Sequence, residues 1–208
     1  MGRHTRSAKP RGRAAEAAVR QKIVIEAARI MAEDGVRDFQ SAKRKAAHRL
    51  NLPEDKNWPG NAEIEAALKQ HLELFQKGSQ AVIHELRAHA LEAMMLLRDF
   101  SPKLVGEVLS GAVTRFPEIQ LHLTTPAPED LGLFLDSHGI PHVMEERRLR
   151  YSDARTVLVP VFRFVAGETA FALYALSPEA IRELPVSPVD GRPMRRAGAR
   201  EVEELLGP

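Results

Sequence analysis

The amino-acid sequence predicts an α+β protein, in which a helical module comes first and a strand-rich α/β unit follows. Apolar residues recur three and four positions apart through most of residues 14 to 98, which is the spacing of one helix face. After Pro102, apolar and polar residues alternate over short runs that are separated by turn residues, which is typical of strands. Helical patterns and strand patterns in separate halves favour the α+β class.

The N-terminal half contains three helical patterns. They span residues 14 to 35, 42 to 50 and 62 to 98, with an expected kink or break at Gly78-Ser79. Gly35 stands where a helix C-cap belongs, Ser41 is a candidate N-cap for the second helix, and Asn61 can cap the third.

The C-terminal half alternates strands with two helices. Strands are predicted over residues 103 to 112, 118 to 124, 142 to 151, 155 to 165 and 169 to 176, and helices over 127 to 139 and 199 to 206. Turns are expected at Ser152-Asp153 and Gly167-Glu168. We therefore divide the chain into a basic disordered arm (1–13), a helical module (14–99) and an α/β domain (100–208).

Composition excludes several classes of protein. The 208 residues are 44% hydrophobic and 28% charged, which suits a soluble protein with a packed core. There is no cysteine, so disulfides and thiolate metal sites are excluded. No apolar run approaches the ~18 residues of a membrane span, and no apolar segment follows the basic N-terminus as in a secretory signal. We expect a cytoplasmic protein that has no contact with the membrane.

Basic residues gather in two places near the N-terminus. The segment "MGRHTRSAKPRGR" has five Lys or Arg and no acid, and the second predicted helix carries Lys43, Arg44, Lys45 and Arg49. Both could contact the phosphates of RNA or DNA. Alternatively, the arm is a disordered solubilising tail and the helix residues are the solvated side of an amphipathic helix.

The run Glu118-Ile119-Gln120-Leu121-His122-Leu123 has the outline of a metal-dependent nucleotidyl-transfer site. Two carboxylates at alternate positions of a strand point to one face, where they can hold the divalent ions that stabilise the attacking and leaving oxygens. The small-residue turn Ser110-Gly111 lies upstream, where backbone N–H groups could approach a triphosphate.

Four segments together carry a resemblance to a known family. In chain order they are "AARIMAEDGV", "AKRKAAHRL", "GEVLSGAVTRFPEIQLHL" and "GRPMRRA". They resemble "AARLM-x-x-x-GV", "AKRKAARRL", "GSVL-x-G-x-x-x-x-x-SDIDLH" and "GKPI-x-RA" of a bacterial family in the nucleotidyltransferase superfamily, which has the polymerase-beta-like fold. The resemblance implies a mixed sheet with flanking helices, Mg²⁺ if the protein is active, and a nucleoside triphosphate as ligand.

The chain departs from that pattern at the acids. The resemblance makes Glu118 a metal ligand, but Gln120 replaces the second acid with a neutral amide and Pro117 replaces the preceding serine. The third acid belongs on a later strand, where the best register gives Ala172.

Two functions remain open from the sequence. The first is a nucleotidyltransferase-like protein with a degenerate site, weakly active or inactive, in which Glu118 and Gln120 act at the metal and Ser110 and Gly111 seat the phosphates. The second is a non-catalytic nucleic-acid-binding or scaffold protein that uses the basic arm and helix. The oligomeric state is not predicted.

Overall fold

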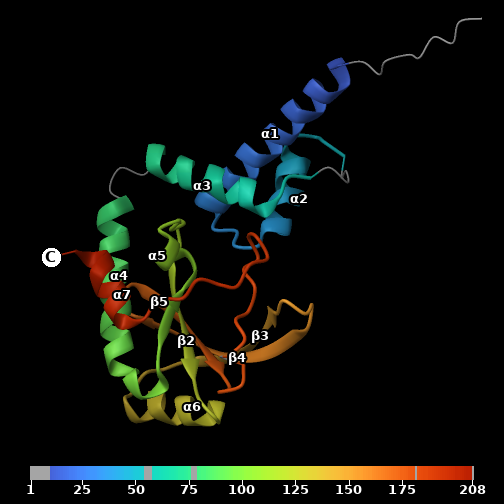
Figure 1. Ribbon diagram of the computed structural model, residues 1–208. Helices are drawn as coiled ribbons and strands as arrows, with labels where there is room; N and C mark the ends of the chain where they lie inside the picture. Colours follow the sequence, from blue (N-terminus) through green and yellow to red (C-terminus); the bar gives the residue numbers. More distant parts are fainter. Residues whose placement is uncertain (1–9, 54–57, 76–78, 181, 208) are drawn as a thin grey trace, which may run out of the picture. The chain divides into compact units, whose positions relative to one another are not determined.

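The computed structural model describes residues 10–53, 58–75, 79–180 and 182–207 (Figure 1). The described residues form helices and one five-stranded mixed sheet, with helices alone in the N-terminal part, which confirms the α+β class. The chain divides into two compact units, Met1–His71 and Leu72–Pro208. This division differs from the predicted one at residue 99, because the helix before the sheet buries its apolar residues in the core of the second unit.

The first unit contains α1 (Pro10–Asp34), α2 (Phe39–Arg49) and the start of α3 (Asn61–Phe75). Helix α1 begins at Pro10, so residues 10–13 are helical and not part of a disordered arm. Residues 1–9 of the predicted arm lie outside the described residues. The buried apolar side chains of this unit include Val24, Ala27, Ile30, Met31, Phe39, Ala42, Ala46, Ile64 and Leu68.

The cap of α2 differs from the prediction. Asp38, not Ser41, is the N-cap, and its carboxylate accepts hydrogen bonds from the Ser41 backbone N–H and hydroxyl, both at 2.7 Å. An ionised carboxylate at this position bonds the free N–H groups of the first turn and favours the positive end of the helix dipole. Gly35 follows α1 with a φ of 68°, as expected for a C-terminal glycine.

The second unit is built around the sheet. Its elements are α4 (Ser79–Leu96), a 3₁₀ turn (Arg98–Phe100), β1 (Lys103–Val105), α5 (Gly106–Ser110), β2 (Glu118–Thr124), α6 (Pro128–Ser137), β3 (Val143–Arg150), β4 (Thr156–Ala166), β5 (Thr169–Leu176) and α7 (Ala199–Leu206). The predicted strand over 103 to 112 is therefore wrong beyond Val105. Gly106 turns the backbone with a φ of 74°. Val108 and Leu109 then lie in the short helix α5, and both are buried.

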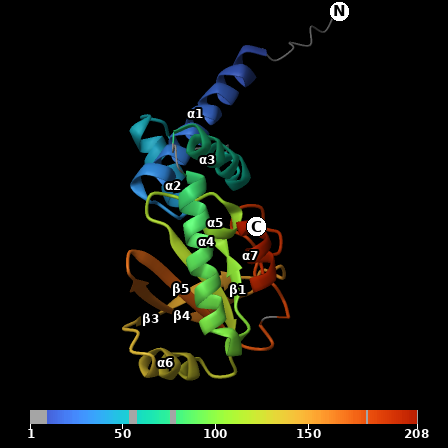
Figure 2. The same ribbon diagram turned by 90° about the vertical axis from the view of Figure 1, so that its left-hand side faces the viewer.

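The sheet order is β1-β2-β5-β4-β3, so β1 and β3 are its edges (Figure 2). Strands β2 and β5 are parallel, and every other neighbouring pair is antiparallel. This places β5 directly beside β2, although β3 and β4 lie between them in the sequence.

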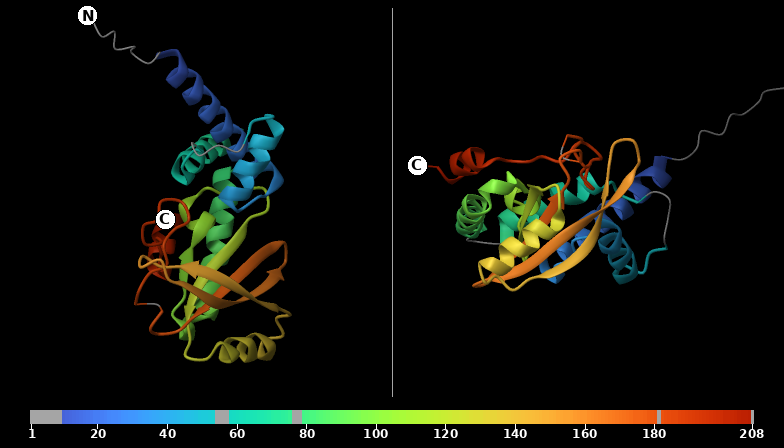
Figure 3. Two further views of the ribbon diagram at one scale, coloured as in Figure 1. Left: turned by 90° about the vertical axis from the view of Figure 1, so that its right-hand side faces the viewer. Right: turned by 90° about the horizontal axis from the view of Figure 1, so that it is seen from below.

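The two faces of the sheet differ in chemistry. Ile119, Leu121 and Leu123 of β2 are fully buried and pack with apolar residues of α4, α6 and α7. The opposite face carries the alternate residues of β2, which are polar. The C-terminal segment runs from β5 to α7 (Figure 3). On its way the Val186 N–H bonds the Arg150 carbonyl, and residue Ala197 bridges to Leu104.

Candidate functional site

Glu118 begins the polar face of β2, and its carboxylate is engaged by an arginine. The residue is buried, with 3% of its surface exposed. The Arg163 Nη2 donates to Glu118 Oε2 at 3.2 Å, and Gln120 Nε2 donates to the same oxygen at 3.4 Å. A cation and an amide donor therefore occupy the coordination space that a metal ion would need.

Arg163 belongs to a short chain of alternating charges across the sheet. Its Nε forms an ion pair with Glu145 Oε1 of β3 at 2.9 Å, and the same oxygen accepts from Arg147 Nε at 2.7 Å. Two carboxylates and two guanidinium groups thus alternate along this face. The arrangement is close to electrically neutral and leaves little uncompensated negative charge to attract a divalent cation.

Gly106 and Glu107, which the sequence analysis did not select, contact the motif strand directly. Glu107 Oε2 accepts from the backbone N–H and the hydroxyl of Thr114, both at 3.0 Å, and Oε1 accepts from the Glu118 N–H at 3.2 Å. A Cβ placed on Gly106 would lie 2.6 Å from Gln120 Oε1. These two residues therefore fix the loop before β2 and the start of the strand.

Ser110 and Gly111, the predicted phosphate-seating pair, lie at the other end of α5. The Ser110 hydroxyl donates to the Glu107 carbonyl at 3.2 Å, and Gly111 is the C-cap with a φ of 79°. Arg87 donates to the carbonyls of Val108 and Leu109, each at 3.2 Å. The C-terminal end of a helix presents carbonyl oxygens, so this turn is poorly suited to a phosphate.

Ala172, the residue predicted at the place of the third acid, lies on β5 directly beside β2. Gln120 pairs with Ala172, which is fully buried and has no donor atom. The three positions that the sequence resemblance makes metal ligands therefore contain an ion-paired Glu118, a neutral Gln120 and an alanine. Mg²⁺ prefers several charged oxygen ligands and water, so these residues do not fit a two-metal site. Among the described residues, no cluster of three His, Asp or Glu side chains could hold a metal ion.

His122 continues the same face but is not placed as a ligand. It is 1% exposed, and its Nδ1 has no hydrogen-bond partner within the described structure. Its ring lies against Tyr174, with the centroids 5.3 Å apart. Burial, together with the charge of Arg196, lowers the pKa of His122 to about 3, so the imidazole is neutral at physiological pH.

A cleft of about 520 Å³ opens beside the Glu118–Arg163 pair. Its lining includes the two charged groups together with Val143, Phe164, Val165 and Phe171. The rings of Phe164 and Phe171 are stacked, with centroids 4.9 Å apart and planes inclined by 6°. Phe171 is only 5% exposed and belongs to the core, so the accessible apolar lining comes from Val143 and Val165. A mainly apolar hollow with a few polar groups is the usual form of a small-molecule site.

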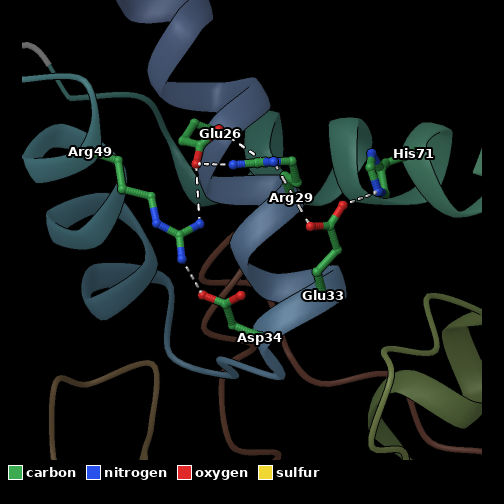
Figure 4. Close-up of polar contacts among 6 residues, drawn as sticks. All are labelled: Glu26, Arg29, Glu33, Asp34, Arg49 and His71. Atoms are coloured by element: carbon green, nitrogen blue, oxygen red, sulfur yellow. Dashed lines mark hydrogen bonds and ion pairs between the residues drawn. The ribbon is translucent and has the colours of Figure 1, made fainter.

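Only part of the predicted nucleic-acid surface of α2 is available. Lys43 is 4% exposed, and burial lowers its pKa. Arg49 bonds Glu26 Oε1 at 3.2 Å and Asp34 Oδ2 at 2.7 Å (Figure 4). Arg44 and Lys45 are exposed.

Figure 4 also shows why Arg49 is structural. Glu26 accepts from both Arg29 and Arg49, so its carboxylate links α1 to α2. Glu33 continues the contacts by pairing with Arg29 at 4.0 Å and His71 at 3.7 Å. The acids of α1 therefore hold Arg49 against the helix pair.

The missed residues were partly visible in the sequence. Gly106-Glu107 aligns with the Gly-Ser pair that opens the "GSVL" segment of the resembling family. This alignment could have indicated that Gly106 and Glu107 contact the strand β2. Arg163 and Glu145 had no such signal, because their approach to Glu118 depends on the order of the strands.

Comparison with known proteins gives no family to which this chain can be assigned. No protein-family model, no curated protein and no solved structure matches it. None of the described helices is long and apolar enough to cross a membrane.

Proposed function

We propose that the Leu72–Pro208 unit is a nucleotidyltransferase-like domain that has lost two-metal catalysis and acts as a nucleotide-binding module. The observation that carries this proposal is the ion pair between Glu118 and Arg163 on the strand where the resembling family places its metal-bound acids. A guanidinium group now balances the charge that a divalent ion would balance in an active enzyme.

The neighbouring residues support a loss of catalysis. Gln120 offers the Glu118 carboxylate a donor instead of a second charge, and Ala172 offers nothing at the third position. Glu107 replaces the serine of the family pattern, and its carboxylate accepts the N–H groups before β2.

The cleft supports the retained binding role. Val143 and Val165, which are 70% and 66% exposed, provide apolar surface for a base, and Arg163 lines the same cleft. Nucleotide binding of this kind needs no metal ion, because the guanidinium group of Arg163 supplies the positive charge.

The catalytic part is tested by incubating the full chain with labelled nucleoside triphosphates, Mg²⁺ and protein or RNA acceptors. We expect no transfer above background. The control variants are Glu118→Gln and, at an exposed helical position, Glu203→Gln. Transfer that requires Mg²⁺ and is lost only in Glu118→Gln would contradict the proposal.

The binding part is tested by equilibrium dialysis with ATP and GTP, with and without Mg²⁺. We expect the same binding in both conditions and weaker binding in Val165→Trp, since Val165 is 66% exposed and lines the cleft. Leu158→Trp is the matched control, because Leu158 is a 52% exposed residue of the same strand outside the cleft lining. Absence of binding, or equal loss in both variants, would refute the binding role.

The second function from the sequence, nucleic-acid contact through α2, now depends on Arg44 and Lys45. Both are exposed, whereas Lys43 and Arg49 serve the packing of the first unit. If this function holds, RNA or DNA binding weakens steeply with salt and is lost in Arg44→Glu/Lys45→Glu. No binding at low salt would exclude it.

A further inference from the structure

Strand β3 is an open edge of the sheet. It has β4 as its only neighbour in the strand order and lies at the opposite end from β1 (Figure 2). Its eight residues are largely exposed, including Val143 at 70% and Met144 at 59%. Open edges present free backbone donors and acceptors and readily pair with another strand.

The hydrogen bonds around Arg150 show which residues of β3 face outward. The Tyr151 N–H bonds the Arg155 carbonyl inside the hairpin, whereas the Arg150 carbonyl accepts from Val186 outside it. Successive residues of an antiparallel strand direct their backbone groups to opposite sides. Met144, Glu146 and Arg148 therefore point their N–H and C=O groups away from β4, and no backbone bond from other described residues reaches them.

The side chains of this edge are complementary to a reversed copy of themselves. The strand reads "VMEERRLR", with two acids followed by two arginines. Charged side chains, especially lysines, usually discourage edge pairing, but the charges of β3 have both signs. Here an antiparallel second copy brings acids opposite arginines, and opposite charges across strands are favourable.

Geometry limits the register of such a pair. In a continuous sheet, residues that lie opposite each other have their side chains on the same face, so they are an even number of positions apart in β3. A two-fold axis perpendicular to the sheet therefore passes through a residue of β3 and not between two residues. An axis at Arg147 would pair Met144 with Arg150, whose carbonyl is already bonded by Val186. An axis at Glu146 uses only the free groups of Met144, Glu146 and Arg148.

The Glu146-centred register also suits the side chains. It places Glu145 opposite the partner's Arg147, and Val143 opposite the partner's Leu149. The two central Glu146 carboxylates repel each other, but each lies diagonally from the partner's Arg148. The attraction to these arginines compensates the repulsion between the carboxylates. The face with Glu145 and Arg147 is then balanced in charge, the face with Glu146 and Arg148 is balanced around the axis, and the exposed Val143 is covered.

We propose that β3 pairs with β3 of a second copy of this chain, antiparallel and centred on Glu146, so that two five-stranded sheets become one. An edge contact buries little area, so the dimer forms as the protein concentration rises and dissociates on dilution. This inference does not depend on the proposed nucleotide-binding role.

Single cysteines test the register, because the natural chain contains none. Only a residue on the two-fold axis meets its own copy, so Glu146→Cys becomes disulfide-linked under mild oxidation. Arg147→Cys and Arg148→Cys are matched controls on the same edge and link only at the background rate. Equal linking of all three, or preferential linking of Arg147→Cys, would overturn the proposed pairing.

Sedimentation equilibrium of the full chain tests the association without a covalent bond. Glu146 is exposed, and its side chain has no hydrogen bond or ion pair with other described residues, so its replacement leaves the folded monomer intact. Glu146→Arg gathers four arginines at the axis and weakens the dimer by roughly tenfold or more, whereas Glu146→Gln does not. Glu203→Arg changes the charge equally on α7 and has no effect. A monomer at every concentration, or a dimer indifferent to Glu146→Arg, would refute the inference.

Discussion

The carboxylate of Glu107 is expected to hold the loop before β2 in place. It accepts hydrogen bonds from the Thr114 N–H, the Thr114 hydroxyl and the Glu118 N–H, at 3.0 to 3.2 Å. Thr114 is buried, with 7% of its surface exposed. Replacing Glu107 by alanine leaves these donors without their acceptor, and replacing it by glutamine turns an N–H₂ group toward one of them.

The size of the effect follows from the number and kind of bonds. A hydrogen bond to a charged group contributes roughly 1.5 to 3 kcal/mol when it is well buried. Glu107 is only half-buried, so about 1 kcal/mol per bond is appropriate and the alanine variant loses about 3 kcal/mol. The glutamine variant keeps one acceptor oxygen and loses about half of this free energy.

Hydrogen exchange at the two backbone amides measures this loss where it occurs. We expect the exchange rates of the Thr114 and Glu118 amides to rise by roughly 100-fold in Glu107→Ala, because about 3 kcal/mol less is needed to open the loop. Urea unfolding should be followed by circular dichroism, since the single tryptophan, Trp58, lies in the first unit. Glu203→Gln controls for the loss of one negative charge.

The reasoning would be refuted by unchanged exchange at both amides in Glu107→Ala. Faster exchange throughout the sheet, with no excess at Thr114 and Glu118, would also contradict it, because the hydrogen bonds of Glu107 would then not act locally. A glutamine variant that equals wild type would show that the negative charge contributes nothing.

Two further predictions concern residues of the same region. The folded pKa of His122 is about 3 against 6.5 for the free side chain, so the unfolded chain binds a proton first as the pH falls. The contribution of the neutral His122 to stability is present above pH 6.5 and is lost progressively toward pH 3, by about 2 kcal/mol between pH 7.5 and 5. The urea midpoint of wild type should therefore fall over this pH range, and it should fall less in His122→Leu. Equal falls in the two proteins would contradict this prediction. Gly106→Ala should lose more stability than Gly139→Ala, because both have positive φ but only Gly106 abuts Gln120. The extra loss of stability in Gly106→Ala is about 0.5 to 1 kcal/mol, since the Gln120 side chain can rotate away. Adding Gln120→Ala to Gly106→Ala should remove this extra loss. Equal losses in Gly106→Ala and Gly139→Ala would count against the contact.

Local patterns determined much of the second unit. The alternation of Ile119, Leu121 and Leu123 predicted β2, because a period of two sets one face toward apolar partners. The turn residues after β3 and β4 predicted the hairpins. Each of these depends on near neighbours or on periodicity, which a sequence displays directly.

Local patterns failed where two signals compete over a few residues. The apolar residues after Lys103 suit a strand or a helical turn equally, and the positive φ at Gly106 decides for α5. Likewise, Ser41 and Asp38 are both good N-caps, and the observed start of the helix selects Asp38. Short segments contain too few turns for periodicity to separate such alternatives.

The sequence by itself determined an α+β chain in which Glu118 and Gln120 take alternate positions on a strand. Only the tertiary structure decided what that glutamate does, because Arg163 lies 45 residues away in the sequence and reaches it across β5. The same holds for Lys43, whose charge looked solvent-facing in the sequence but is buried in the first unit. Composition gives the number of charges, whereas their partners and burial depend on the order in which strands and helices pack.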